Sequence, residues 1–250
     1  MSKATYSPIV ELRMYSLHPG KRDELIELFD REFVETQEAV GVQVIGQFYD
    51  LDDPDQFVWL RGFNDMSARE GSLNAFYNGP IWKAHRDAAN ATMIDSDNVL
   101  LLRRVHPTSG FSLKNGNRPP RGSRAGRDGF VAVTIYYFKK PVTSDFINYF
   151  EITMQPDLIE SGASILGYFV TEDSPNTFPS LPVRDGEHVF VWFGGFPHQD
   201  AYKSHLSKLR ESKLWNDEIA KFLKKHLQGK PEVLRLTPTP RSSLTGKVYR

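Results

Sequence analysis

The heptapeptide FVWLRGF occupies residues 57–63, and a near copy, FVWFGGF, occupies residues 190–196. The two stretches agree at five of seven positions and start 133 residues apart, at 57 and 190. Further matching pairs lie on both sides of these stretches: Tyr15 with Tyr136, Gly46 with Gly167, Trp82 with Trp215, and Leu101 with Leu234. A repeat that extends over this much of the chain predicts a duplicated domain and not a short structural repeat.

Each copy is predicted to fold in the order β-α-β-β-α-β. In the first copy, apolar alternation predicts strands at residues 9–17, 42–49, 57–63 and 99–105. Apolar periodicity of about 3.6 residues predicts helices at residues 21–40, 66–77 and 81–93. This order is the ferredoxin-like arrangement, in which helices cover one face of the sheet. The fold class is therefore α+β, with two tandem ferredoxin-like (βαββαβ) domains that pair their open faces within one chain.

The two copies differ in the length of one hairpin. Eight residues separate Phe48 from Phe57, whereas twenty separate Phe169 from Phe190. Because insertion into a surface hairpin costs little, we interpret the difference as drift between the copies.

Composition shifts divide the chain into four segments: a first domain at 8–106, a basic Gly/Pro-rich linker at 107–128, a second, divergent domain at 129–238, and a tail at 239–250. The linker is predicted to be mobile between Lys114 and Arg127, because it holds too little apolar surface to offset the cost of ordering. Every third residue from 118 to 127 is arginine, and both a solvated linker and a contact with an anion or nucleic acid remain open. We expect the tail to be loosely attached.

The bulk composition excludes several classes of function. Thirty-one basic residues balance thirty-one acidic ones, so the net charge gives no overall attraction to nucleic acid. The absence of cysteine excludes disulfides, thiolate metal sites and a cysteine nucleophile, and the seven histidines show no HxH or HExxH spacing. No apolar run reaches the ~18 residues of a membrane span. We therefore expect a cytoplasmic protein without a metal or other cofactor, and leave a homo-oligomer open.

Three stretches of the first copy resemble the NIPSNAP family: ELRMYSLHPGK at 11–21, FVWLRGF at 57–63, and FYNGPIWKAHRDAANATMIDSDNVLLLR at 76–103. The second copy is more divergent, since GPIWKAH becomes SKLWNDE. The resemblance implies a dimeric α+β barrel, which here would form within one chain. It also implies a superfamily that includes cofactor-free monooxygenases, isomerases and haem enzymes, so that function must be argued from the site.

One face of the predicted sheet in the first copy carries charged side chains. Because strand residues alternate between faces, Glu11, Arg13 and Tyr15 share a face with Trp59 and Arg61. We predict that this face points into the barrel, toward the second copy.

The second copy lacks these charges but keeps the tryptophan. The corresponding pairs are Arg13 with Thr134, Arg61 with Gly194, and Trp59 with Trp192. We predict that the two tryptophans lie near the shared interior. Since a duplicated shell needs only one working site, the asymmetry predicts that the site belongs to the first copy.

The helix at 81–93 adds a titratable group to this candidate site. Trp82 and His85 share one of its faces, with Arg86 and Asn90 nearby. A neutral histidine can act as a general base near pH 7, and an arginine can hold a developing enolate or carboxylate. We therefore predict His85 and Arg61 as catalytic residues. The predicted substrate-binding residues are Glu11, Arg13, Tyr15, Trp59, Trp82, Arg86 and Asn90.

Two functions from different classes remain open. The first is binding of a small organic molecule in the barrel, with cofactor-free monooxygenase or isomerase chemistry. The second is a non-enzymatic interaction or stress-signalling scaffold. For the charged residues themselves, a buried ion network that only satisfies itself, with a structural His85, is the alternative to a ligand site.

Overall fold

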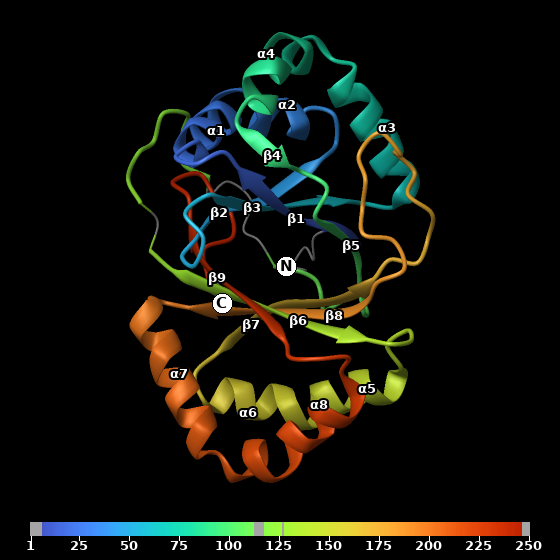
Figure 1. Cartoon of the computed structure of the whole chain (residues 1–250), viewed down its shortest axis with the longest axis vertical. Helices are drawn as coiled ribbons and strands as arrows, with labels where there is room; N and C mark the ends of the chain where they lie inside the picture. The colour runs from blue at the N-terminus through green and yellow to red at the C-terminus, as the bar shows by residue number, and fades with distance from the viewer. Residues whose placement is uncertain (1–6, 113–117, 127, 247–250) are drawn as a thin grey trace, which may run out of the picture.

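Eight strands close into a β-barrel in the computed structural model, which describes residues 7–112, 118–126 and 128–246 (Figure 1). The hydrogen-bonded order is β3-β2-β9-β6-β8-β7-β5-β1, and β1 pairs with β3 to complete the ring. One further described strand, β4, pairs with the end of β1. The strands are β1 Ile9–Leu17, β2 Gln43–Asp50, β3 Gln56–Phe63, β4 Met93–Asp95, β5 Val99–Arg104, β6 Phe130–Phe138, β7 Ser164–Thr171, β8 His188–Phe196 and β9 Glu232–Pro238.

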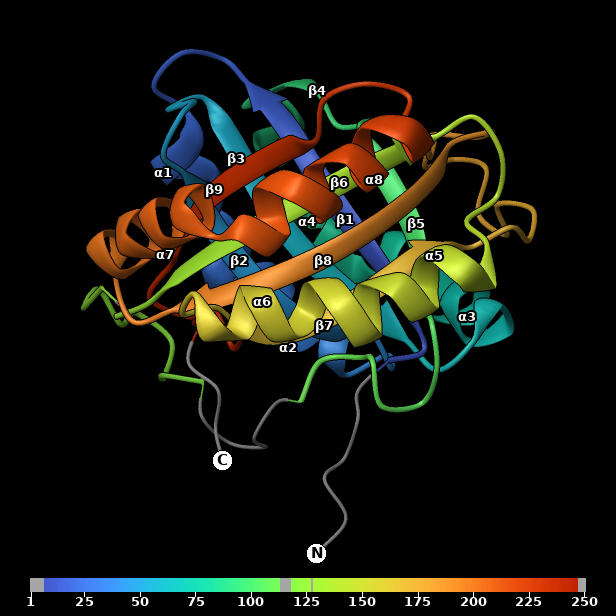
Figure 2. The same cartoon turned by 90° about the horizontal axis from the view of Figure 1, so that it is seen from below.

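The helices form two layers on opposite sides of the barrel. Those of the first half are α1 Arg22–Leu28, η1 Phe29–Phe33, α2 Val34–Glu38, α3 Met66–Tyr77 and α4 Pro80–Asn90. Those of the second half are α5 Ser144–Tyr149, η2 Phe150–Met154, α6 Gln155–Glu160, α7 Gln199–Glu211, η3 Trp215–Ile219 and α8 Ala220–His226. Figure 1 shows the first layer above the barrel and the second below it. Figure 2, viewed from below, shows the second layer across β6, β7 and β8.

The two halves close the barrel through two strand pairs. The first half has the strand order β5-β1-β3-β2, and the second half has the order β9-β6-β8-β7. The antiparallel pairs β2–β9 and β5–β7 join the halves. A barrel that closes within one chain is therefore confirmed.

Apolar side chains from both halves fill the barrel. Val10, Leu12 and Leu60 pack in one buried cluster with Val131 and Val191 across the barrel. An eight-stranded barrel has an interior just wide enough for side chains to fill. The interior is thus a packed core, and the described strands turn their other face toward the helices.

The charged face of the first half points outward, beneath the helices. Trp59 packs with Tyr15 and with Phe29 and Phe33 of η1. Trp192 belongs to a separate cluster beneath the helices of the second half. The prediction that the charged face and the two tryptophans meet inside the barrel is therefore wrong. The reason is that the helices supply hydrogen-bond partners for buried polar groups, whereas the barrel interior is occupied by apolar side chains.

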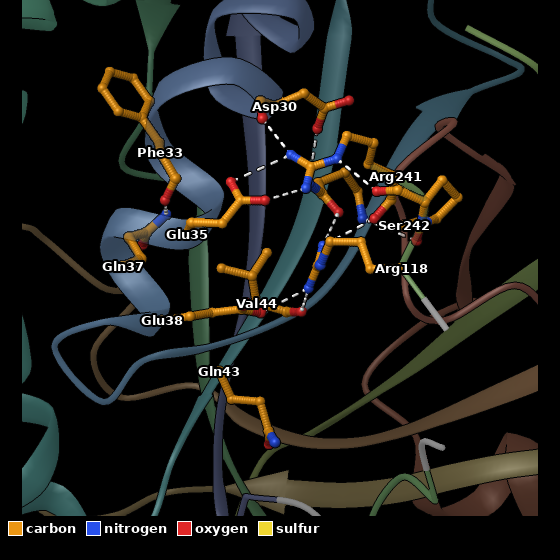
Figure 3. Close-up of polar contacts among 12 residues, drawn as sticks. Asp30, Phe33, Glu35, Gln37, Glu38, Gln43, Val44, Arg118, Arg241 and Ser242 are labelled. Carbon is orange, nitrogen blue, oxygen red and sulfur yellow. Dashed lines mark hydrogen bonds and ion pairs between the residues drawn. The ribbon is translucent and has the colours of Figure 1, made fainter. Parts of the chain in front are cut away.

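The linker and the tail are anchored on α2 and β2 (Figure 3). Arg118 Nη2 lies 2.7 Å from a Glu38 carboxylate oxygen and donates to the Val44 carbonyl at 2.6 Å, and its Nη1 donates to the Arg241 carbonyl at 2.8 Å. Arg241 is 2% exposed and pairs with the Glu35 carboxylate. The loosely attached tail that the sequence predicts is therefore wrong for residues 239–246.

The predicted mobile linker is likewise anchored at Arg118, and Arg121 Nε lies 3.1 Å from a Glu35 carboxylate oxygen. Arg118 and Arg121 therefore find anionic partners within the same chain, on α2. Residues 114–117 and Arg127, which the prediction also covers, lie outside the described residues.

We expect Arg241→Ala to lower the free energy of unfolding by about 2–3 kcal/mol, because it removes charge-assisted hydrogen bonds from a buried guanidinium. The matched control is Arg235→Ala, which breaks the exposed pair with Asp52 and should cost less than about 1 kcal/mol. Urea denaturation of both variants measures the difference. Equal losses would show that the tail contributes no more than a surface ion pair.

Candidate functional site

A buried carboxylate collects three arginines on the outer face of the first-half sheet. Glu11 on β1 lies directly opposite Arg61 on β3. One oxygen of Glu11 accepts hydrogen bonds from Arg13 Nη1 at 2.6 Å and from Arg61 Nε at 2.7 Å, and the other accepts one from Arg69 Nε at 2.6 Å. All four side chains have 0% exposure. Burial alone would raise the pKa of Glu11, but Arg61, Arg13 and Arg69 outweigh it and hold this pKa well below its usual range.

Arg69 is a site residue that the sequence prediction missed. It lies on α3, where the only sequence signal is an arginine in an otherwise helical stretch. Its Nη1 donates to Asn176 Oδ1 at 2.9 Å and to Thr177 Oγ1 at 3.1 Å, both in the β7–β8 hairpin of the second half. Burial lowers the pKa of Arg69, in opposition to the field of Glu11. One carboxylate thus serves three guanidinium groups.

A cavity of about 80 Å³ lies beside this cluster, between the sheet and the helices of the first half. Half of its lining residues are aromatic, among them Phe29 and Phe33 of η1. Four of the predicted substrate-binding residues line it: Tyr15, Trp59, Trp82 and Asn90. The other lining residues are Leu25, Phe29, Phe33, Gln37, Phe76, Tyr77, Ala89, Met93, Ser96 and Leu181.

Two hydrogen-bond donors belong to the cavity wall. Tyr15 Oη accepts a hydrogen bond from Arg13 Nε at 2.7 Å, which leaves the phenol proton to donate elsewhere. Burial raises the pKa of Tyr15 against the opposing field of Arg13, so the phenol stays protonated at neutral pH. Trp59 is 2% exposed, and its Nε1 is buried without a hydrogen-bond partner in the described part of the chain. Tyr15 and Trp59 thus bring an O–H and an N–H group to the residues of an otherwise largely apolar wall.

The long hairpin between β7 and β8 closes one side of this cavity. Its Leu181 lines the cavity, and its Phe178 stacks on Tyr77 with ring centroids 5.6 Å apart. Figure 1 shows the hairpin rising from the barrel along α3. The longer hairpin of the second half therefore contacts the candidate site of the first half.

The other predicted site residues do not line the cavity. Glu11, Arg13 and Arg61 are behind its wall and do not line it. His85 is on the outer side of α4, with Nε2 3.6 Å from a Glu32 oxygen, and Arg86 pairs with Asp87 at the surface. The prediction that His85 and Arg61 line one cavity is therefore wrong, because residue 85 of α4 faces η1 and solvent instead of the sheet.

Residues 10–107 match the sequence model of the NIPSNAP family. These residues form a NIPSNAP domain. The buried cluster and most of the cavity wall lie within it, and Leu181 is the cavity residue supplied from outside it.

Solved structures share the fold over nearly the whole chain. An anthrone oxidase-like protein is 12% identical, with a TM-score of 0.58 and 99% coverage of each chain. A candidate monooxygenase from Fusobacterium nucleatum is 14% identical, with a TM-score of 0.55, covering 98% of this chain and 99% of that one. A NIPSNAP-like domain protein from Burkholderia xenovorans is 26% identical over 45% of this chain and 90% of its own, with a TM-score of 0.35. No curated protein matches the chain. At 12–14% identity, the first two similarities establish the fold alone.

The second half fills the corresponding region differently. Trp192 Nε1 donates to Tyr136 Oη at 3.4 Å, so the tryptophan that matches Trp59 has a partner there. A Cβ on Gly194, the counterpart of Arg61, would lie 2.9 Å from the ring of Trp192. The ring thus occupies the space that a side chain at position 194 would need.

Within the described residues, no group of three or more His, Cys, Asp or Glu side chains is placed to hold a metal ion. In the same part of the chain, none of the helices has the length and apolar character needed to cross a membrane.

We expect Glu11→Gln to lower the free energy of unfolding by about 3–5 kcal/mol, because it leaves buried guanidinium groups without their carboxylate. The control Glu24→Gln removes an exposed partner of Lys21 and should cost less than about 1 kcal/mol.

The pH dependence gives a second measurement of the same interaction. Because the pKa of Glu11 is depressed in the folded state, its contribution is complete above the usual value of 4.5 and is lost as the pH falls below it. The wild type should show this loss in acid denaturation, and Glu11→Gln should show less of it. Matching acid profiles would mean that Glu11 does not hold the cluster together.

Proposed function

We propose that this protein binds a small planar organic molecule in the cavity of its NIPSNAP domain. The observation that carries the proposal is an aromatic-rich cavity, lined by a tryptophan whose buried N–H has no partner among the described residues. Small-molecule sites are typically apolar concavities with a few placed polar groups. Tyr15 and Trp59 would supply those groups here.

The size of the cavity limits the ligand. Its volume of about 80 Å³ is roughly half of an engineered cavity of ~150 Å³ that accepts benzene. A single ring would therefore extend toward the exposed Asn90 or displace Leu181 of the hairpin. We propose single-ring molecules as the first ligands to test, with the hairpin as the element that adapts to larger ones.

We interpret the two halves as tandem ferredoxin-like units, at 8–106 and 129–238, of which the first holds the site. Their equal strand orders support this interpretation. So do two register shifts at corresponding places, between Val44 and Gly46 on β2 and between Ile165 and Gly167 on β7. Bulges of this kind re-aim strand side chains and are retained as features of a fold.

A second candidate function is oxidation of the bound molecule by dioxygen without a cofactor. This chemistry needs hydrogen-bond donors that stabilise an enolate oxygen. Tyr15 and Trp59 are candidates for these donors, and Arg13 donates to Tyr15 from behind the wall. The names of the two full-length structural neighbours, anthrone oxidase-like and candidate monooxygenase, agree with it. In such a reaction an activated CH₂ group and O₂ give C=O and H₂O, so no external reductant is consumed.

The binding proposal is tested by filling the cavity. Ala89 is 1% exposed and lines the cavity, so Ala89→Leu should occupy part of the space and weaken binding of phenol, benzyl alcohol and benzamide by about tenfold or more. Ala91→Leu, on the exposed surface two residues later, is the matched control and should bind as the wild type does. Ligand-observed NMR titration measures the affinities, and thermal unfolding verifies the fold of both variants.

Two results would contradict the proposal. Unchanged binding in Ala89→Leu would place the ligand elsewhere. A wild type that binds none of these fragments would favour the scaffold function instead.

For the oxidation candidate, we expect one O₂ consumed per product formed when a ring compound with an acidic CH₂ group, such as anthrone or a smaller single-ring analogue, is supplied in the presence of a metal chelator. An oxygen electrode measures the uptake. Ala89→Leu should reduce uptake in parallel with binding. Uptake that persists in this variant, or that the chelator abolishes, would remove cofactor-free oxidation at this cavity.

A further inference from the structure

We propose that the ligand of this cavity carries an anionic oxygen, as a carboxylate, phenolate or enolate, and that it completes the charge balance of the buried arginine cluster. This inference rests on the proposed function, because it names the chemical class of the molecule that the same cavity takes. It follows from the charges, the unpartnered donors and the position of the cluster relative to the cavity.

The cluster has more positive than negative charge. Arg13, Arg61 and Arg69 are each fully buried, and Glu11 is the one carboxylate that they contact among the described residues. Their other partners are neutral oxygens, which belong to Tyr15, Gln37, Tyr77, Ser96, Asn176 and Thr177. A buried charge without a counter-charge is strongly unfavourable. An ion network that existed only to satisfy itself would balance its charges, and this one has an excess of two cations.

The same cluster leaves hydrogen-bond donors unused. Nη2 of Arg61 and Nη2 of Arg69 are buried and lack a partner in the described part of the chain, as does Nε1 of Trp59. Buried polar atoms in folded proteins are nearly always hydrogen-bonded, so unpaired ones point to a missing acceptor. Among the described residues, the buried cluster is therefore short of hydrogen-bond acceptors as well as of negative charge.

The charges lie directly behind the cavity wall. Arg13 donates to Tyr15 Oη at 2.7 Å, and Arg61 Nη1 lies 3.3 Å from Gln37 Oε1 and 3.4 Å from Tyr77 Oη. Tyr15, Gln37 and Tyr77 all line the cavity.

Each of these wall groups is therefore polarised from behind by a cation. A hydroxyl that accepts a charge-assisted hydrogen bond becomes a better donor to the next acceptor. An anionic oxygen in the cavity would meet these polarised donors, and the field of the guanidinium groups would reach it through them.

A hydrogen bond to the π-helical turn η1 fixes the position of Gln37 in this wall. Gln37 Nε2 donates to the Phe33 carbonyl at 3.1 Å, which leaves Gln37 Oε1 directed to Arg61. The guanidinium of Arg61 also lies 5.2 Å from the centre of the Trp59 ring. The ring that lines the cavity is thus in contact with the cation behind it.

The test compares two molecules of nearly the same shape, benzoate and benzamide, at pH 7. We expect the wild type to bind benzoate about tenfold more tightly than benzamide, as charge-assisted hydrogen bonds exceed neutral ones. Arg61→Gln, which keeps a neutral donor, should lose most of this preference while its affinity for benzamide stays within about twofold. Ligand-observed NMR titration gives both affinities, and retained benzamide binding shows that the variant is folded.

Tyr15→Phe is a second variant that leaves every charge in place. It should weaken benzoate binding more than benzamide binding, because it removes the donor that Arg13 polarises. If Arg61→Gln does not fold, this variant and the wild-type pair of ligands still decide the question.

The outcomes separate the inference from the function on which it rests. Equal affinities for the two molecules in the wild type, both lost in Ala89→Leu, would keep the cavity as a binding site and overturn the anionic ligand. Benzoate binding that Ala89→Leu leaves unchanged would be adventitious and would overturn both proposals. Binding of neither molecule would also overturn both.

Discussion

The narrow interior of an eight-stranded barrel determines where this protein can place large charged and polar side chains. Side chains from both halves fill that interior completely. The strands therefore have one other face for large aromatic and charged groups, the face beneath the helices. The candidate site lies there, where helical residues such as Gln37 and Tyr77 accept the hydrogen bonds that a buried guanidinium requires. The barrel serves as the rigid support on which β1 and β3 hold Glu11 opposite Arg61.

The two halves show what the same framework does with and without those charges. In the second half, Trp192 donates to Tyr136, and its ring closes over Gly194. In the first half, the corresponding tyrosine, Tyr15, accepts from Arg13 instead. Trp59 Nε1 has no partner among the described residues, and a cavity lies beside the ring. The packed layer of one half and the candidate site of the other thus differ in a few side chains on one strand face.

The barrel and the grouping of the charged residues could be predicted from the sequence. The predictions that failed all depend on tertiary contacts. Alternation along β1 and β3 correctly groups Glu11, Arg13 and Arg61, because strand geometry fixes which residues share a face. It does not fix which side of the sheet that face covers when both sides are buried. The repeat identifies the internal barrel closure, yet the contacts of Arg69 and Arg118 depend on tertiary distances with no local signal. Composition predicted a mobile linker because it counts apolar residues and not hydrogen bonds such as those of Arg118.

The β7–β8 hairpin makes the site a property of the whole chain. It comes from the half that lacks the charges, yet its Asn176 and Thr177 hold Arg69, and its Leu181 closes the cavity. A NIPSNAP domain alone would expose Arg69 and the open side of the cavity to water, which would screen the charges that distinguish this site. The second half therefore contributes more than a second wall for the barrel. Its hairpin supplies neutral hydrogen-bond partners to a buried cation of the first half and one side of the cavity beside it, so that the candidate site depends on both halves.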